Sequence, residues 1–280
     1  MKKWMLFGCI CIMVFLFYFT SKTYEFTHLE LPSLHSQNAL LLNEQGDVLY
    51  EKNADAIIYP ASLTKIMTAI VAIEMTDNLQ TQTIVEPPQT IANYTAQNAS
   101  MAGFQAGDFV TMEDLLYGTL LASGADATGT LADAVAGSED KFVTLMNNKA
   151  QELGMHDTHF VNTSGLHDEA HVSSVRDISK LLQYALENPI FYQIFTSKSY
   201  TTYVPNQLII TNSLFTKLPG LDSPIIGGKT GYTPEAGLCL ASIIEKEGKS
   251  FLFITTNAPS YLWNPPPPHI EDALTAFEAL

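Results

Sequence analysis

The stretch Pro60-Ala61-Ser62-Leu63-Thr64-Lys65 stands directly before an apolar run over residues 66–73. A serine hydroxyl is a weak nucleophile until a base takes its proton, and a lysine three residues later lies one helical turn away on the same face. Burial against the apolar run favours the neutral, basic form of Lys65. In a first helical turn the N–H of Ser62 also lacks a partner and can donate to an oxyanion. The stretch therefore predicts that Ser62 is a nucleophile and Lys65 is its base.

The S-x-x-K spacing is not specific on its own, because a chain of this length is expected to contain it roughly once by chance. A second match, at Ser138 and Lys141, has two acidic residues between its ends. Acids directly after a serine are typical of the first turn of a helix that the serine caps. We predict that this second match only begins a helix over residues 138–153, and other residues must decide what the first match does.

Composition limits the classes of protein that fit. The chain has 280 residues, of which 46% are hydrophobic and 15% are charged, and such a chain can bury a substantial core. The formal net charge is −15 and no basic cluster is present, which argues against nucleic acid as a partner. Because Cys9 and Cys11 lie in an N-terminal apolar run, Cys239 has no partner for an internal disulfide and is expected to be a small buried side chain.

The N-terminus resembles a membrane segment. Two lysines, Lys2 and Lys3, precede an uncharged apolar run over residues 4–20, which is the short end of a membrane span. The lysines stay on the cytoplasmic side, so the rest of the chain is expected outside the cytoplasm. No small-residue cleavage signature follows, so a retained anchor over residues 1–20 is favoured over a removed signal segment, which would give a secreted protein. Residues 21–36 are predicted to be a linker, and residues 37–280 the folded domain.

Strand patterns occupy both ends of this domain, and helical patterns lie between them. Strands are predicted at residues 38–43, 47–51, 224–231, 237–244 and 250–256. Helices are predicted at residues 66–73, between Thr111 and Ser123, and at residues 126–135, 138–153, 175–186 and 270–280. Residues 84–110 are predicted to form loops and short strands. We therefore expect a mixed α/β fold in which the first and last strands meet in one sheet around a largely helical insertion.

A second group of residues suited to chemistry is Lys229-Thr230-Gly231, which Gly228 precedes. Glycines on both sides of the Lys-Thr pair let a ligand approach the backbone of this strand closely. The lysine and the threonine offer a cation and a hydroxyl that can hold a carboxylate. The alternative is an exposed strand end without a function, but chance produces this tripeptide in only roughly a few per cent of chains this long.

The order of these motifs points to a known family. Serine penicillin-recognising enzymes have three motifs in a fixed order. The order is S-x-x-K, then a serine about sixty residues later, then K-T-G about a hundred residues further on, and this chain has the same order. The chain resembles the low-molecular-weight D-alanyl-D-alanine carboxypeptidases, which are penicillin-binding proteins of peptidase family S11. The likeness covers residues 36–280 and is clearest at residues 59–69, 113–118, 146–150, 160–168 and 228–233. It implies a beta-lactamase/transpeptidase-like fold with an antiparallel sheet, and a catalytic D,D-peptidase domain over residues 37–280.

The resemblance implies a catalytic role for three residues. Ser62 would be the acylated nucleophile, Lys65 its base, and Ser123 a relay that passes a proton between the lysines and the leaving amine. No cofactor and no metal ion is implied.

It also implies how the substrate is held. Lys229 and Thr230, with Gly231 beside them, would hold the terminal carboxylate of the substrate. The backbone N–H groups of Ser62 and Tyr232 would form the oxyanion hole.

The activity implied is removal of the terminal D-alanine from peptidoglycan stem peptides through an acyl-serine intermediate, a reaction of cell-wall synthesis and cell-shape control. Beta-lactams would be covalent inhibitors, and the N-terminal segment would hold the domain at the outer side of the cytoplasmic membrane. Many relatives carry a further beta-rich C-terminal domain with a membrane-binding tail. The N-terminal anchor is expected to replace that tail.

One position departs from the family pattern. The middle motif of the family is Ser-x-Asn, whereas this chain has Ser123-Gly124-Ala125. A methyl group can neither hold the substrate's carbonyl nor position Lys65 as an amide does. The sequence is consistent with several consequences of this change. The activity could be reduced, the substrate preference could differ, or Asp126 or a water could replace the amide. A non-catalytic sensor module that binds penicillin or peptidoglycan therefore stays open as an alternative.

Two other enzyme classes fit the same residues less well. A beta-lactamase shares the scaffold, but Glu169 does not stand in the Glu-x-x-x-Asn pattern of the class A enzymes. Zinc peptidases also cleave D-alanyl-D-alanine, and His156, His159, His167 and His171 lie close in sequence. The H-E-x-x-H motif is absent there, so no metal site is predicted.

Overall fold

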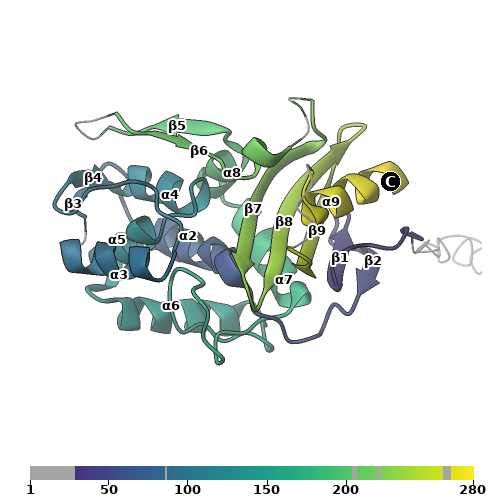
Figure 1. Ribbon diagram of the computed structural model, residues 1–280, viewed down its shortest axis with the longest axis horizontal. Helices are drawn as coiled ribbons and strands as arrows, with labels where there is room; N and C mark the ends of the chain where they lie inside the picture. The colour runs from purple at the N-terminus through teal and green to yellow at the C-terminus, as the bar shows by residue number, and fades with distance from the viewer. Residues whose placement is uncertain (1–28, 86, 204–206, 219, 221, 261–265) are drawn as a thin grey trace, which may run out of the picture.

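The computed structural model describes residues 29–280 except residues 86, 204–206, 219, 221 and 261–265. A five-stranded sheet with the strand order β2-β1-β9-β8-β7 stands beside a group of helices (Figure 1). Every neighbouring pair of strands in it is antiparallel. Because β1 (Asn38–Leu42) pairs with β9 (Lys249–Ala258), the first and last strands meet in one sheet, as predicted.

Tight turns join the strands where the sequence indicates them. β2 (Val48–Lys52) follows β1 through a turn in which Gly46 has φ +82°. β8 (Gly237–Lys246) and β9 are joined by Glu247 and Gly248, which both have positive φ, as a two-residue hairpin turn requires. β7 (Ile225–Thr233) is the edge strand of the sheet. The predicted strands are thus confirmed.

The sheet is buried on both faces, which explains why its strands read as nearly continuous apolar runs. α9 (Pro268–Ala279) packs on the face that carries Leu41, Leu240 and Phe253. α7 (Val175–Leu186) and the other helices lie on the opposite face, which carries Leu40 and Cys239. Cys239 is fully buried, as predicted, and burial raises the pKa of its thiol to about 12.

The central helix of the insertion is α2 (Thr64–Glu74), which follows the short 3-10 turn η1 (Ala61–Leu63). All residues from 64 to 73 are buried, because helices surround α2. The surrounding helices are α4 (Met112–Leu120), α5 (Ala125–Ala136), α6 (Glu139–Glu152), α7 and α8 (Pro189–Thr196). The predicted helices are confirmed at α2, α4, α5, α6 and α7, whereas no helix was predicted at α8.

Side chains cap the starts of two of these helices. Thr111 and Asp114 form a reciprocal capping box at the start of α4, with both hydrogen bonds at 3.0 Å. Ser138 accepts the backbone N–H of Lys141 at 3.4 Å. The second S-x-x-K match therefore begins a helix, as predicted.

Two α-helices and two strands in the described part of the chain were not predicted. β3 (Gln82–Ile84) and β4 (Phe109–Thr111) are short strands, but α3 (Pro88–Ala96) is a helix inside the segment predicted as loops and short strands. Only Tyr94 of α3 is buried, so the helix leaves no apolar stripe in the sequence. Pro189 begins α8 instead of only ending α7, and a hairpin of β5 (Ser199–Thr201) and β6 (Ile209–Thr211) follows it.

The predicted linker over residues 21–36 needs a correction in its described part, residues 29–36. Leu29 donates its backbone N–H to Leu49 at 2.8 Å, and Leu34 is buried in the apolar cluster beneath α9. The side-chain carboxylate of Asp272 in α9 accepts the backbone N–H groups of His35 and Ser36 at 2.8 Å each. The folded domain therefore begins before residue 37.

The predicted anchor over residues 1–20 lies outside the described residues. Within the described part of the chain, no helix combines the length and the apolar character that a membrane crossing needs.

Asp272 is expected to be a stabilising residue, because its buried carboxylate accepts the backbone N–H groups of His35 and Ser36 in the segment that leads into β1. Replacing it in Asp272→Ala leaves these donors without a partner, so we expect the free energy of unfolding to fall by about 2–3 kcal/mol. Glu278 is exposed on the same helix, and Glu278→Ala is the matched control with an expected change within about 0.5 kcal/mol. Urea unfolding followed by circular dichroism measures both, and equal stabilities of the two variants would contradict this role.

Candidate active site

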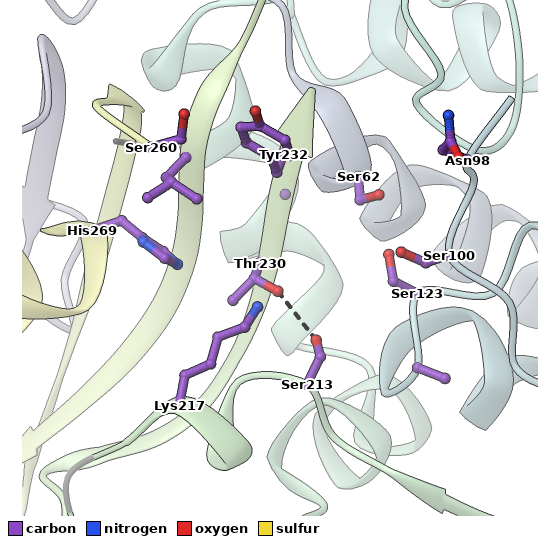
Figure 2. Close-up of a pocket in the computed structure, with 13 residues that line it drawn as sticks. Ser62, Asn98, Ser100, Ser123, Ser213, Lys217, Thr230, Tyr232, Ser260 and His269 are labelled. Carbon is purple, nitrogen blue, oxygen red and sulfur yellow. Dashed lines mark hydrogen bonds between the residues drawn. The ribbon is translucent and has the colours of Figure 1, made fainter. Parts of the chain in front are cut away.

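Ser62 lies in η1, between the edge strand β7 and a loop that contains Gly165 (Figure 2). A Cβ atom on Gly165 would lie 1.9 Å from the carbonyl oxygen of Ala61, and one on Gly231 would lie 3.1 Å from the backbone nitrogen of Ser62. Ala61 itself has φ +46°. Two glycines therefore allow the backbone of η1 to be held from both sides.

Lys65 has the environment that its predicted role needs. It is 2% exposed, and its Nζ donates hydrogen bonds to Ser62 Oγ at 3.1 Å and to the carbonyl oxygen of Ser164. Burial lowers the pKa of Lys65 to about 7, although the negative charge of Asp126 opposes this shift. A lysine with such a pKa is neutral in a large part of the molecules at neutral pH, so it can take a proton from the serine that it contacts.

Ser123 and Lys229 form a second serine and lysine pair in the same place. Lys229 is 1% exposed, and its Nζ donates to Ser123 Oγ at 2.9 Å and to the carbonyl oxygen of Thr230 at 2.8 Å. Burial, together with the positive charge of Lys65, lowers the pKa of Lys229 well below its usual value. Ser123 has φ +63°, a conformation that a non-glycine residue adopts at a cost and that is often found at functional sites.

The other predicted residues lie on the edge strand β7. Thr230 Oγ1 is 3.1 Å from Ser213 Oγ, and Tyr232 is 50% exposed beside them. Thr230, Gly231 and Tyr232 line a pocket of about 480 Å³ together with Ser62 and Ser123. The fold thus brings the three sequence motifs to one pocket. As the edge strand, β7 has one side without a neighbouring strand, and an extended peptide can pair there.

The position that departs from the family pattern is closed off from the pocket. The side chain of Ala125 is fully buried at the start of α5. The carboxylate of Asp126 accepts the backbone N–H groups of Ala102, Gly103 and Phe104 at 2.8 to 3.1 Å. Asp126 is therefore engaged by a neighbouring loop and does not replace the missing amide. The backbone N–H of Ala125 instead donates to the carbonyl oxygen of Ser100 at 2.8 Å.

This last hydrogen bond brings a segment to the pocket that sequence reasoning missed. Six further polar residues line the pocket in the described part of the chain, and they come from four separate segments. They are Asn98, Ser100, Ser213, Lys217, Ser260 and His269. None belongs to a motif or a hydrophobic period, so only the tertiary structure reveals them.

Of the clustered histidines, His171 holds the protein backbone next to the active site. The backbone N–H of Val161 donates to His171 Nδ1 at 3.1 Å, so Nε2 carries the proton and donates to Thr64 Oγ1 at 2.8 Å. Thr64 Oγ1 in turn donates to the carbonyl oxygen of Ala61 at 2.8 Å, which fixes η1 next to Ser62. Burial lowers the pKa of His171 to about 4. Among the described residues, no group of three or more His, Cys, Asp or Glu side chains is placed to hold a metal ion.

The site holds a serine in contact with a buried lysine, and a second serine and lysine pair lies beside it at the edge of an antiparallel sheet. This arrangement defines an active-site-serine hydrolase. Known proteins agree with this class. The D-alanyl-D-alanine carboxypeptidase family, Peptidase S11, matches residues 25–260. The chain therefore belongs to the D-alanyl-D-alanine carboxypeptidase family.

Individual relatives cover most of the chain. D-alanyl-D-alanine carboxypeptidase DacF of Bacillus subtilis (strain 168) is 34% identical over 74% of this chain, which spans 53% of that relative. D-alanyl-D-alanine carboxypeptidase of Streptomyces sp. (strain K15) is 36% identical over 75% of this chain and 76% of its own length. The crystal structure of the Streptomyces K15 DD-transpeptidase superposes with a TM-score of 0.78 at 30% identity, covering 90% of this chain and 98% of that one. The predicted beta-lactamase/transpeptidase-like fold is confirmed.

Gly165 and Gly137 together test how η1 is held. Both have positive φ, but a Cβ atom on Gly137 would meet nothing within 4 Å. We expect Gly137→Ala to lower the free energy of unfolding by about 1 kcal/mol and to leave acylation of Ser62 by benzylpenicillin unchanged. Gly165→Ala must also displace Ala61, so we expect a larger loss of stability and slower acylation. Urea unfolding measures the stability of both variants, and acylation reactions quenched at set times measure the acylation rate. Equal stabilities and equal acylation rates of the two variants would contradict the close contact of Gly165 with Ala61.

Proposed function

We propose that this protein is a serine D-alanyl-D-alanine carboxypeptidase that removes the terminal D-alanine from peptidoglycan stem peptides. The observation that carries the proposal is the contact of the buried Lys65 Nζ with Ser62 Oγ at 3.1 Å, in a pocket beside the edge strand β7. Membership of a carboxypeptidase family supports the same reaction. The chain spans about half the length of the Bacillus relative. The reaction and its substrate are therefore both part of the proposal.

In the acylation step, neutral Lys65 takes the proton of Ser62 while Ser62 Oγ attacks the carbonyl carbon of the penultimate D-alanine. The backbone N–H groups of Ser62 and Tyr232 stabilise the oxyanion that forms. The C–N bond then breaks and leaves an ester on Ser62. Ser123 relays a proton from the lysines to the leaving amine, so the proton taken from Ser62 is balanced by the proton that the released D-alanine gains.

In the deacylation step, a water molecule replaces D-alanine in the pocket. Lys65 takes a proton from this water, whose oxygen attacks the ester carbonyl, and the C–O bond to Ser62 breaks. Ser62 recovers its proton from Lys65, and the shortened stem peptide leaves. A beta-lactam enters by the same first step and forms the corresponding penicilloyl ester.

The place of action is part of the proposal. We propose that the catalytic domain works outside the cytoplasm and is held at the cytoplasmic membrane by residues 1–20, or is secreted if that segment is removed. The supporting observation is the uncharged apolar run over residues 4–20 directly after Lys2 and Lys3. There the domain meets peptidoglycan stem peptides that end in D-Ala-D-Ala.

A second candidate function is a non-catalytic module that is acylated by penicillin or binds stem peptides without turnover. One observation favours it, namely that Ala125 is buried and that Asp126 is engaged elsewhere, so this motif supplies no polar group to the substrate. The two candidates differ in whether the acyl-enzyme breaks down.

Intact-protein mass spectrometry over time after addition of benzylpenicillin separates these candidates. We expect one penicilloyl adduct on the wild-type protein and none on Ser62→Ala, together with release of D-alanine from diacetyl-L-Lys-D-Ala-D-Ala by the wild type only. Stable acylation without release of D-alanine would favour the sensor module. No adduct and no release, in a folded protein, would exclude the proposed function.

The pH dependence of the reaction follows from Lys65. Only the neutral amine acts as a base, and burial lowers the pKa of Lys65 to about 7. As the pH rises through this value the neutral fraction grows, so kcat/KM for the stem-peptide mimic is expected to increase between about pH 6 and pH 8 and then to level off. Circular dichroism over the same range controls for unfolding. A value of kcat/KM that falls with rising pH across this range would contradict Lys65 as the base.

A further inference from the structure

The second S-x-x-K match contains an acid that contacts the segment beside the nucleophile. Glu139 is the first residue of α6 and is half-buried, whereas the next residue, Asp140, is exposed. An acid in the first turn of a helix ordinarily interacts with the helix dipole and with water. Glu139 instead accepts the backbone N–H of Thr163 at 2.9 Å and the Thr163 hydroxyl at 2.7 Å. Because Thr163 is fully buried, this carboxylate satisfies two buried donors.

Thr163 is the first of three consecutive residues that contact the helix of Lys65 or the turn of Ser62. The carbonyl oxygen of Thr163 accepts the Thr68 hydroxyl of α2 at 2.7 Å. The carbonyl oxygen of Ser164 accepts a hydrogen bond from Lys65 Nζ. Gly165 lies against the backbone of η1. The position of Thr163 therefore determines where the next carbonyl group and the next glycine lie.

The Ser164 carbonyl group has a specific effect when Lys65 is neutral. A neutral amine has two N–H donors and one lone pair, and only the lone pair can take a proton. Lys65 Nζ contacts Ser62 Oγ at 3.1 Å and the carbonyl oxygen of Ser164. When one N–H donates to this carbonyl group, the amine is rotated so that its lone pair can face the Ser62 hydroxyl. A displaced carbonyl group would leave the amine free to rotate, and fewer molecules would have the base aligned.

Helix α6 holds this segment at two points. Asn147, about two turns after Glu139, exchanges hydrogen bonds with the backbone of Phe160 at 2.8 and 2.9 Å. Asn147 thus fixes the start of the segment, and Glu139 fixes it next to Lys65. Helix α6 also packs against α2 (Figure 1). The helix that carries Glu139 and the helix that carries Lys65 are therefore held together by apolar contacts, and the segment lies on both.

We propose that Glu139 is a positioning residue for the acylation of Ser62, because through Thr163 it holds the Ser164 carbonyl group that orients the Lys65 amine. This inference rests on the proposed function, in which Lys65 is the base, and it adds a residue that acts through others. Both Thr163 donors end on the same oxygen, Oε1 of Glu139. The position therefore requires a hydrogen-bond acceptor there, and the negative charge is not essential. A glutamine offers the same acceptor with two lone pairs.

Acylation kinetics with benzylpenicillin test this role, because they give separately the acylation rate constant and the dissociation constant of the non-covalent complex. We expect Glu139→Ala to lower the rate constant by about 10- to 100-fold, as misplacement of a reacting group does. The described residues that line the pocket do not include Glu139, so the dissociation constant should change by less than about threefold. Glu139→Gln should restore the rate constant to within about fivefold of the wild type. Asp140→Ala removes an acid from the same helical turn and is the matched control, with both constants unchanged.

A second variant keeps the proposal testable if Glu139→Ala does not fold, which circular dichroism and urea unfolding establish. Thr163→Val removes the hydroxyl donor but keeps the backbone N–H and nearly the same volume. We expect it to lower the acylation rate constant by about three- to tenfold. When it is combined with Glu139→Ala, the loss should be no larger than in Glu139→Ala alone, because both changes break the same contact.

Several results would overturn the proposal. These are an unchanged rate constant in Glu139→Ala or, if that variant does not fold, in Thr163→Val, an equal loss in Asp140→Ala, or an equal loss in Glu139→Gln and Glu139→Ala. A loss that appears in the dissociation constant and not in the rate constant would overturn it too.

Release of D-alanine from diacetyl-L-Lys-D-Ala-D-Ala, measured in parallel, separates this proposal from the function on which it rests. If the wild type is acylated but releases no D-alanine, the proposed function fails, and slower acylation in Glu139→Ala with rescue in Glu139→Gln still supports the positioning role. If the wild type releases D-alanine and Glu139→Ala acylates at the wild-type rate, the proposed function stands and the positioning role fails. A folded wild-type protein that reacts with neither peptide nor penicillin would overturn both.

Discussion

The burial of Lys65 is the constraint on which the active site depends. Its ammonium group contacts neutral oxygens of Ser62 and Ser164 rather than a carboxylate, so the protein interior opposes its charge. Lys229 nearby adds a second buried amine, and each charge disfavours the other. The apolar packing around α2 is therefore part of the chemistry as well as of the fold. If α2 were exposed, Lys65 would keep its proton at neutral pH and Ser62 would have no base.

The sheet explains how residues so far apart in the sequence meet. Because β1 and β9 pair, the two ends of the domain form one rigid support, and β7 becomes the free edge of that support. The helical insertion leaves the sheet after β2 and returns before β7, so it carries Ser62 and Ser123 to this edge, where Lys229 lies. At Gly165 and Gly231 the neighbouring backbone leaves no room for a Cβ atom beside Ala61 and Ser62. The position of the nucleophile is thus fixed by main-chain packing, which is more rigid than side-chain contact alone.

The sequence predicts those parts of the structure that obey a local rule. The turn at Gly46, the cap at Thr111 and the apolar helix behind Ser62 each have a local signature, and each is found. The helix α3 and the hairpin of β5 and β6 lie on the surface with few buried residues, so no hydrophobic period marks them. The motif residues of the site were found because the order of the three motifs is specific, although the S-x-x-K spacing alone is not. Asn98, Lys217 and His269 reach the pocket only through tertiary contacts, for which a single sequence holds no signal.

Several departures from ordinary folding preferences lie at this pocket, although others lie elsewhere in the described part of the chain. Among the described residues, seven non-glycine residues have positive φ, and Ala61, Asn98 and Ser123 lie at or next to the pocket. His269 lines the pocket without a described hydrogen-bond partner, and Lys65 and Lys229 are buried against Ser62 and Ser123, which line the same pocket. Strained backbone and unpaired buried polar groups each cost roughly 1–3 kcal/mol. If the domain were only a scaffold, substitution of these residues would remove their unfavourable free energy, since ordinary caps and apolar contacts are used elsewhere in the chain. Those that lie around Ser62 coincide with the pocket that the motifs identify, so the strain of Ala61 and Ser123 belongs to the geometry that places the nucleophile and the second serine.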